Sequence, residues 1–111
     1  MENHTEAERI ARTESLFREV NERIAESAER FDADDAEFVC ECADPGCAQR
    51  VPATLDEYEE VRDDGATFLL VPGHEDERFE AVVEVGGGHA VVQKHDPVIA
   101  PLVRRLDPRT A

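Results

Sequence analysis

Residues 38–47 read FVCECADPGC and contain all three cysteines of this 111-residue chain. The alternation of Phe38, Cys40 and Cys42 predicts a short strand that carries these side chains on one face, because successive strand residues point to opposite faces. The Asp-Pro-Gly sequence that follows is typical of a type II turn, with proline at its second position and glycine at its third. Such a turn folds the chain back and brings Cys47 towards Cys42. We therefore expect the three thiols to converge.

Three converging thiols need one more partner to form a structural zinc site, which has four sulfur or imidazole ligands in a tetrahedron. The spacing C-x-C-x4-C permits this geometry but differs from the common C-x2-C pattern. His74 is the favoured fourth ligand because it follows a predicted buried strand and lies in a Pro-Gly turn that fixes its direction. His89, in a glycine-rich turn, is the second candidate, whereas His4 and His95 lie where a long helix and a tail begin. The predicted metal ligands are Cys40, Cys42, Cys47 and His74.

Other readings of the cysteine cluster stay open. Zinc with a structural role is the expected cofactor, and iron is the alternative metal. Free cysteines are often simply small buried apolar residues. A disulfide between Cys42 and Cys47 is disfavoured by the odd number of cysteines and by a reducing compartment. A redox role is disfavoured because the acidic neighbours Glu41 and Asp44 raise the pKa of a thiol, whereas a bound metal stabilises the thiolate.

Length and composition predict one small soluble domain. A chain of 111 residues with 5% aromatic residues and no tryptophan can build only a modest core. The polar, acidic start lacks the apolar stretch of a secretory signal, and no apolar run is long enough to cross a membrane, so a cytoplasmic protein is expected. The net charge of -15, from 27 acidic and 12 basic residues, repels nucleic-acid backbones and disfavours direct nucleic-acid binding.

A long amphipathic helix is expected over residues 6–31. Its apolar stripe contains four residues spaced by seven and two further residues between them. The four are Ile10, Phe17, Ile24 and Phe31, and the two are Val20 and Ala28. Four pairs in which a glutamate precedes an arginine by four residues are assigned to the outer face: Glu8–Arg12, Glu14–Arg18, Glu19–Arg23 and Glu26–Arg30. Each pair is expected to add about 0.3 kcal/mol to the stability of the helix. A coiled-coil dimer is the alternative, but Thr13 and Ser27 weaken such a seam. We expect the helix to pack on the chain's own sheet.

The remaining pattern completes an α+β fold. Strands are predicted at residues 37–42, 49–53, 67–71, 79–85 and 90–94, the last two joined by a triglycine hairpin. A capping box of Thr54 and Glu57 opens a short helix that runs to about Arg62. The prediction is a long N-terminal helix and one short helix on a mostly antiparallel sheet within a single domain, residues 1–95. Residues 96–111 contain three prolines and are expected to be an extended or disordered tail, with docking of residues 98–106 as the alternative.

Several segments in this order resemble a family of small bacterial proteins whose function is uncharacterised. The matching segments are LFREVNERI at 16–24, FVCECADPGC at 38–47, LDEYEEVR at 55–62, FLLVPGH at 68–74 and AVVQK at 90–94. Shared motifs are F-R-x-V-N-E-R-I, C-E-C-x4-C, E-Y-E-x-V-R and P-G-H. The resemblance implies that Cys40, Cys42, Cys47 and His74 form one metal site, and it brings no activity with it.

These observations favour a binding role over catalysis. A site whose four ligands all come from the protein has no open position for water, and no nucleophile arrangement has a recognisable local signature. We expect a zinc-stabilised binding or adaptor protein that acts through contacts with an unidentified protein partner, as a monomer or weak dimer. One alternative is a sensor or enzyme with an open cysteine cluster. Another is an acidic inhibitor or nucleic-acid mimic, because of the charge of -15.

Overall fold

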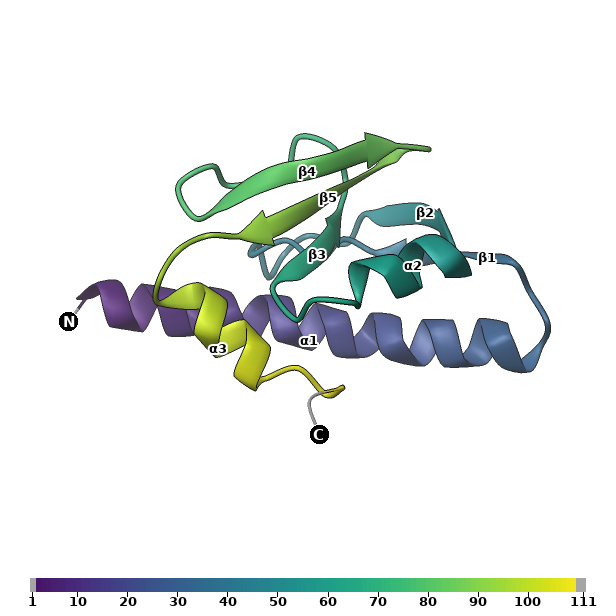
Figure 1. The fold of residues 1–111 in the computed structure, drawn as a ribbon, viewed down its shortest axis with the longest axis horizontal. Helices are drawn as coiled ribbons and strands as arrows, with labels where there is room; N and C mark the ends of the chain where they lie inside the picture. Colours follow the sequence, from purple (N-terminus) through teal and green to yellow (C-terminus); the bar gives the residue numbers. More distant parts are fainter. Residues whose placement is uncertain (1, 110–111) are drawn as a thin grey trace.

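The computed structural model describes residues 2–109, with side chains from residue 6 onward. Its elements in chain order are α1 (Glu2–Arg30), β1 (Asp35–Val39), β2 (Arg50–Thr54), α2 (Leu55–Val61), β3 (Thr67–Leu70), β4 (Glu80–Gly86), β5 (His89–Lys94) and α3 (Ile99–Arg105). Helix α1 runs along the bottom of the molecule in the view of Figure 1, and all the strands lie above it. None of the described helices is both long enough and apolar enough to cross a bilayer.

The strands form two antiparallel sheets. Strands β1 and β2 pair with Phe38 opposite Val51, and the second sheet has the order β3-β5-β4 with β5 in the centre. The β4–β5 turn places Gly87 and Gly88 at φ values of 61° and 88°, which glycine adopts at little cost. The α+β prediction is confirmed, but the strands divide between two sheets where one was expected.

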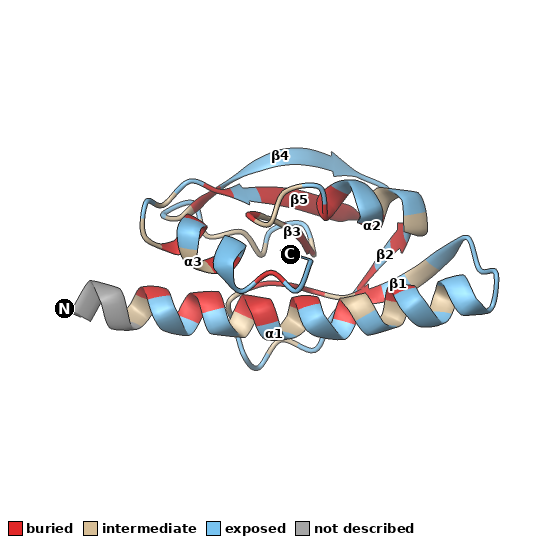
Figure 2. Cartoon of the chain, turned by 60° about the horizontal axis from the view of Figure 1, so that its bottom comes forward, coloured by how far each residue is buried: buried red, intermediate tan, exposed pale blue. Residues whose placement is uncertain are grey.

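The core lies between α1 and the sheets, where the short helices also pack. Phe38 of β1 stacks on Tyr58 of α2, with ring centroids 4.6 Å apart. The capping box of Thr54 and Glu57 is present and fixes the start of α2 directly after β2. The other large apolar side chains that are fully buried are Val51, Phe68, Leu69, Leu70, Val92, Ile99 and Val103. Figure 2 shows that the buried residues of α1 face this core.

Helix α1 buries a different face from the predicted one. The inward residues follow a 3-4 spacing and are small or polar: Ala7, Ala11, Glu14, Arg18, Asn21 and Ala25. Ile10 is buried as predicted, but Val20 is 39% exposed and Phe31 is 77% exposed. Glu14 and Arg18, assigned to the outer face, are fully buried. The physical reason is that distant partners bond to them: Lys94 pairs with one Glu14 oxygen, and the Arg18 guanidinium donates to the carbonyls of Gly65 and Val103, at 2.6 and 2.7 Å.

Residues 96–109 do not form an extended or disordered tail. Helix α3 packs against α1, and its Ile99 and Val103 are fully buried. The helix starts because the carboxylate of Asp96 accepts hydrogen bonds from the backbone N–H groups of Val98 and Ile99. Beyond it, the Arg109 guanidinium pairs with the carboxylates of Glu22 and Glu59. Packing of this segment against the domain was the alternative expectation.

Ile99→Ala is expected to destabilise the protein by about 2–5 kcal/mol, because it removes a fully buried side chain of α3 from the core and leaves a cavity. Leu106→Ala is the control, since Leu106 is 45% exposed at the end of the same helix. Urea unfolding of both variants measures the difference. Equal, small losses would mean that α3 is not part of the folded domain.

Candidate metal centre

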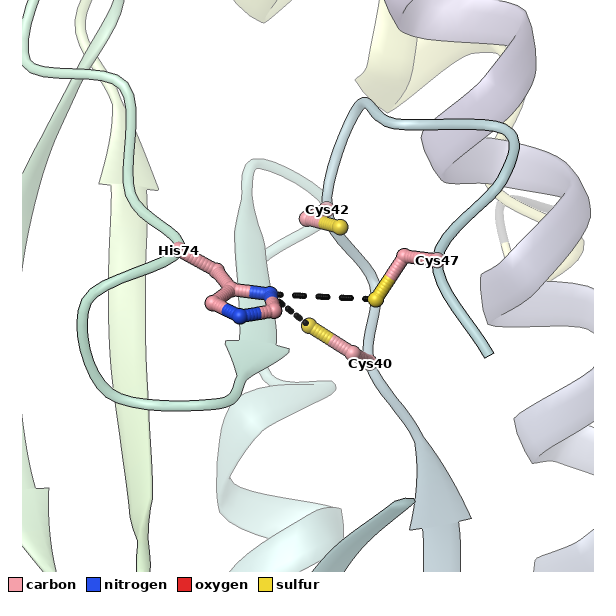
Figure 3. Close-up of side chains that lie close together, drawn as sticks. All are labelled: Cys40, Cys42, Cys47 and His74. Carbon is pink, nitrogen blue, oxygen red and sulfur yellow. Dashed lines mark hydrogen bonds between the residues drawn. The ribbon is translucent and has the colours of Figure 1, made fainter. Parts of the chain in front are cut away.

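The structure brings together the four residues predicted as ligands (Figure 3). One ligand atom from each of Cys40, Cys42, Cys47 and His74 lies within 4.8 Å of every other. His74 Nδ1 is 3.5 Å from the Cys40 sulfur and 3.7 Å from the Cys47 sulfur. A tetrahedral zinc ion with ordinary bond lengths places its sulfur and nitrogen ligands about 3.5 Å apart. Three soft sulfurs and one imidazole nitrogen at this separation fit a metal ion.

Cys40 follows directly after β1 and is held from two sides. Its backbone N–H donates to the Gln49 carbonyl at 3.1 Å, which extends the pairing of β1 and β2 by one residue. The backbone N–H of Val71 donates to the Cys40 sulfur at 3.2 Å. A backbone donor of this kind orients a ligand and stabilises its thiolate form. Cys40 is therefore fixed relative to the end of β3, from which His74 also comes.

Glu41 anchors the segment between the first two cysteines. Its side chain is fully buried; one carboxylate oxygen accepts from the Leu69 N–H at 2.9 Å and the other from the Asn21 side chain at 2.7 Å. The Glu41 N–H in turn donates to the Leu69 carbonyl. Burial raises the pKa of Glu41 to about 7, although both hydrogen bonds favour its charged form. This glutamate thus clamps the cysteine segment to β3 and α1.

The turn before Cys47 forms, but it is not type II. The Cys47 N–H donates to the Asp44 carbonyl at 3.0 Å, which closes a four-residue turn. A type II turn requires a positive φ at Gly46, and Gly46 does not have one. The Asp44 carboxylate accepts a hydrogen bond from the Gly46 N–H at 2.9 Å. This bond stabilises a turn in which Gly46 does not need a positive φ. The predicted consequence still holds, because Cys47 lies beside the other two sulfurs.

His74 is positioned by the Pro-Gly turn after β3. Gly73 adopts a φ of 94°, a conformation that side-chain-bearing residues rarely adopt, and the His74 N–H donates to the Val71 carbonyl at 3.0 Å. The turn directs Nδ1 of the imidazole at the sulfurs, as Figure 3 shows. Two loops that are distant in the sequence therefore meet at this centre.

The thiols themselves favour a metal over a reactive thiolate. Burial raises the pKa of Cys40, opposed by the hydrogen bond from Val71, and burial also raises the pKa of Cys42. All three cysteines are free, so the considered disulfide between Cys42 and Cys47 is absent. A divalent cation would supply the positive charge that these crowded sulfurs need in order to ionise.

Neither His89 nor His95 joins the centre. His89, the second candidate, is buried at the start of β5, where its ring Nδ1 lies 3.2 Å from the Pro52 carbonyl. His95 is exposed after β5 and is not part of the cluster. The side chain of His4 lies outside the described part of the chain. Among the described histidines, only His74 lies with the cysteines.

A second buried polar cluster was not predicted from the sequence. Lys94 Nζ lies between two buried carboxylates: it is 2.6 Å from a Glu14 oxygen and also contacts Glu80. Burial raises the pKa of Glu14 to about 8, opposed by the charge and hydrogen bond of Lys94. The one available signal was that Lys94 is the chain's only lysine. Glu14 and Glu80 of this cluster line a cavity that also reaches Cys42 and His74.

Comparison with protein-family models, curated proteins and solved structures gives no match. The resemblance noted from the sequence motifs therefore stays a prediction, and the site is interpreted from its geometry.

Proposed function

We propose that this chain is a zinc-stabilised binding or adaptor protein of the cytoplasm that acts through protein contacts. The observation that carries the proposal is the convergence of three sulfurs and one imidazole nitrogen within 4.8 Å. Sulfur and imidazole ligands suit zinc, and four of them complete its usual coordination in a structural site. A reducing compartment keeps the thiols free to bind it.

A structural role follows from where the ligands lie. The cysteine segment follows β1 and His74 follows β3, so a bound ion would join the two sheets of the domain. Cys40 and Cys42 are only 1% and 4% exposed, which leaves little room for a substrate at these sulfurs. Metal-binding energy in such a site contributes directly to folding. The proposed partner is a protein with a basic surface, because the chain carries a net charge of -15.

Protein purified from a zinc-replete host is expected to contain about one zinc ion per chain, as a closed four-ligand site predicts. Mass spectrometry of metal content measures this, and thermal unfolding with EDTA should show a lower melting temperature. Less than about 0.2 zinc per chain, with unchanged stability in EDTA, would contradict the metal proposal. If the protein contains iron and no zinc, the proposed metal site stands and only the assignment of zinc as its ion is wrong.

A second candidate function is a sensor or enzyme with an open cysteine cluster. The observation that favours it is a cavity that reaches Cys42 and His74. The two candidates differ in thiol reactivity, because an open cluster exposes a thiolate whereas a closed zinc site protects its sulfurs. Alkylation of the native protein distinguishes them. Slow alkylation that accelerates after chelation supports the closed site, and fast alkylation of the zinc-loaded protein supports the open one.

A further inference from the structure

Helix α1 carries a row of apolar residues that its own domain leaves partly exposed, and we call this row the exposed seam. It follows a spacing of three and four residues through Thr13, Leu16, Phe17, Val20, Ile24, Ser27 and Phe31. Leu16, Val20 and Phe31 are 60%, 39% and 77% exposed, and Phe17 and Ile24 are half-buried. Figure 2 shows that exposed and half-buried residues alternate with the buried ones along the length of α1.

The most exposed residue of the seam, Phe31, is held in place by the end of the helix. The Ala33 N–H donates to the Ala28 carbonyl at 2.8 Å and the Asp32 N–H donates to the Glu29 carbonyl at 3.1 Å. These are the two hydrogen bonds of a Schellman cap. Asp32 occupies the left-handed position of the cap, with a φ of 56°. Because the cap fixes the backbone at Phe31, less conformational freedom is lost when the exposed ring binds a partner.

The spacing of the seam indicates what covers it. A second α-helix with the same alternation of three and four residues packs side by side with such a row, as in a coiled coil. An identical α1 has this spacing in full. Thr13 and Ser27 are polar, so they lower the affinity of the pair without interrupting the contacts of Leu16, Val20 and Phe31 on either side of them.

The other group of exposed apolar residues lies on β4. This strand is at the edge of its sheet, since it pairs only with β5, and its Val82, Val83 and Val85 are exposed. Its pairing with β5 shifts register between Val82 and Glu84. An irregularity of this kind hinders the addition of a further strand at an edge. The seam of α1 is therefore the better surface for self-association, and β4 provides the control.

The charges at the two ends of the seam favour an antiparallel pair. An antiparallel register that places Val20 of each copy opposite Ile24 of the other also places Arg12 opposite Asp32. Both of these charged residues are exposed, and Arg12 forms no ion pair with any side chain that the structure describes. A parallel pair would instead bring the two acidic ends together, with Asp32 and Asp34 of one copy beside those of the other.

We propose that two copies of this chain form an antiparallel dimer through the exposed seam of α1. Phe31 of each copy then packs near Thr13 of the other. The net charge of -15 on each copy opposes association, but ions screen charges more than about 8 Å apart at physiological ionic strength. The paired charges at the ends of the seam are closer than that. The proposal goes beyond the metal site, since the seam contains none of the candidate metal ligands.

Sedimentation equilibrium of the zinc-loaded full-length protein, at an ionic strength of about 0.15 M, tests the proposal. A monomer–dimer equilibrium with a Kd below about 0.5 mM is expected, and weaker association would overturn the proposal. Zinc content is measured on the same samples. A dimer without zinc would contradict only the metal site, and a zinc-loaded monomer would contradict only the dimer.

Single substitutions on the seam locate the interface. Leu16→Gln and Phe31→Ser change exposed side chains, so each is expected to fold and to weaken dimerisation about tenfold or more. Val85→Thr removes a similarly exposed apolar side chain from β4 and should leave the Kd unchanged. Circular dichroism checks the fold of each variant. A loss in Val85→Thr without a loss in the two seam variants would place the interface on β4 and overturn the proposal.

A charge exchange tests the antiparallel direction. Arg12→Glu and Asp32→Lys are each expected to dimerise more weakly than the wild type, because like charges then face each other at both ends. A mixture of the two variants in equal amounts should associate about threefold more tightly than either variant alone, since both ends of the mixed dimer again carry opposite charges. Equal association of the mixture and the separate variants would overturn the antiparallel dimer.

Discussion

His74→Ala is expected to remove most of the stability that the proposed zinc ion would give to the wild-type protein. An ion that binds only the folded state stabilises it by about 4 kcal/mol when free zinc is 1,000 times its Kd. Removing the one imidazole ligand raises the Kd and releases the turn after β3 from the cysteine segment. Thermal unfolding with and without added zinc measures the effect. The wild type should gain a large zinc-dependent shift in melting temperature, and the variant should gain little.

His95→Ala is the matched control for His74→Ala. It makes the same chemical change at an exposed histidine outside the cluster, so its zinc-dependent stability should equal that of the wild type. A cobalt-substituted sample adds a spectroscopic readout, since tetrahedral thiolate coordination gives intense visible absorption that His74→Ala should alter. Equal zinc-dependent stability in the two variants would show that His74 is not a ligand.

The centre could be predicted from the sequence because its information is local. A strand over residues 37–42 was expected to place Cys40 and Cys42 on one face; β1 ends at Val39, and the two sulfurs still lie together. A tight turn returns Cys47 to them, whichever turn type forms. The choice of His74 depended on a Pro-Gly turn after an apolar strand, which is again a short-range signal. The four candidate ligands come from two short segments, so the only tertiary feature that had to be assumed was that these segments lie close together.

The buried face of α1 could not be predicted in the same way. Apolar periodicity selects Val20 and Phe31 as core residues, but both are exposed. The helix instead turns Glu14 and Arg18 inward, where they bond to Lys94 and to two backbone carbonyls. Those partners lie far along the chain, so no local pattern reveals them. The missed helix α3 is different, because Asp96 followed by Pro97 is a helix-start signal that the prolines obscured.

Lys94→Met is expected to destabilise the protein by about 3–5 kcal/mol at pH 9, because it leaves Glu14 and Glu80 buried without a counter-charge. Methionine keeps much of the length of the lysine stem, so the change tests charge more than packing. The double variant Lys94→Met/Glu14→Gln should recover part of the lost stability, because it removes one of the two buried carboxylates that no longer have a counter-charge. Urea unfolding of the zinc-loaded proteins measures all three. A loss below about 1 kcal/mol would mean that the cluster is not buried as the structure places it.

The pH dependence of this loss has a defined sign. Burial raises the pKa of Glu14 from 4.5 to about 8, so the folded protein holds this proton to higher pH than the unfolded chain. The resulting stability is fully present below about pH 4.5 and is lost as the pH rises through about 8. Without Lys94, the factor that lowers the pKa of Glu14 is gone, and Glu14 holds its proton more tightly. The stability difference between wild type and Lys94→Met should therefore widen from pH 6 to pH 9. Zinc content is checked at each pH, because protons compete with the metal for its ligands, and a difference that stays constant or narrows would contradict the assignment.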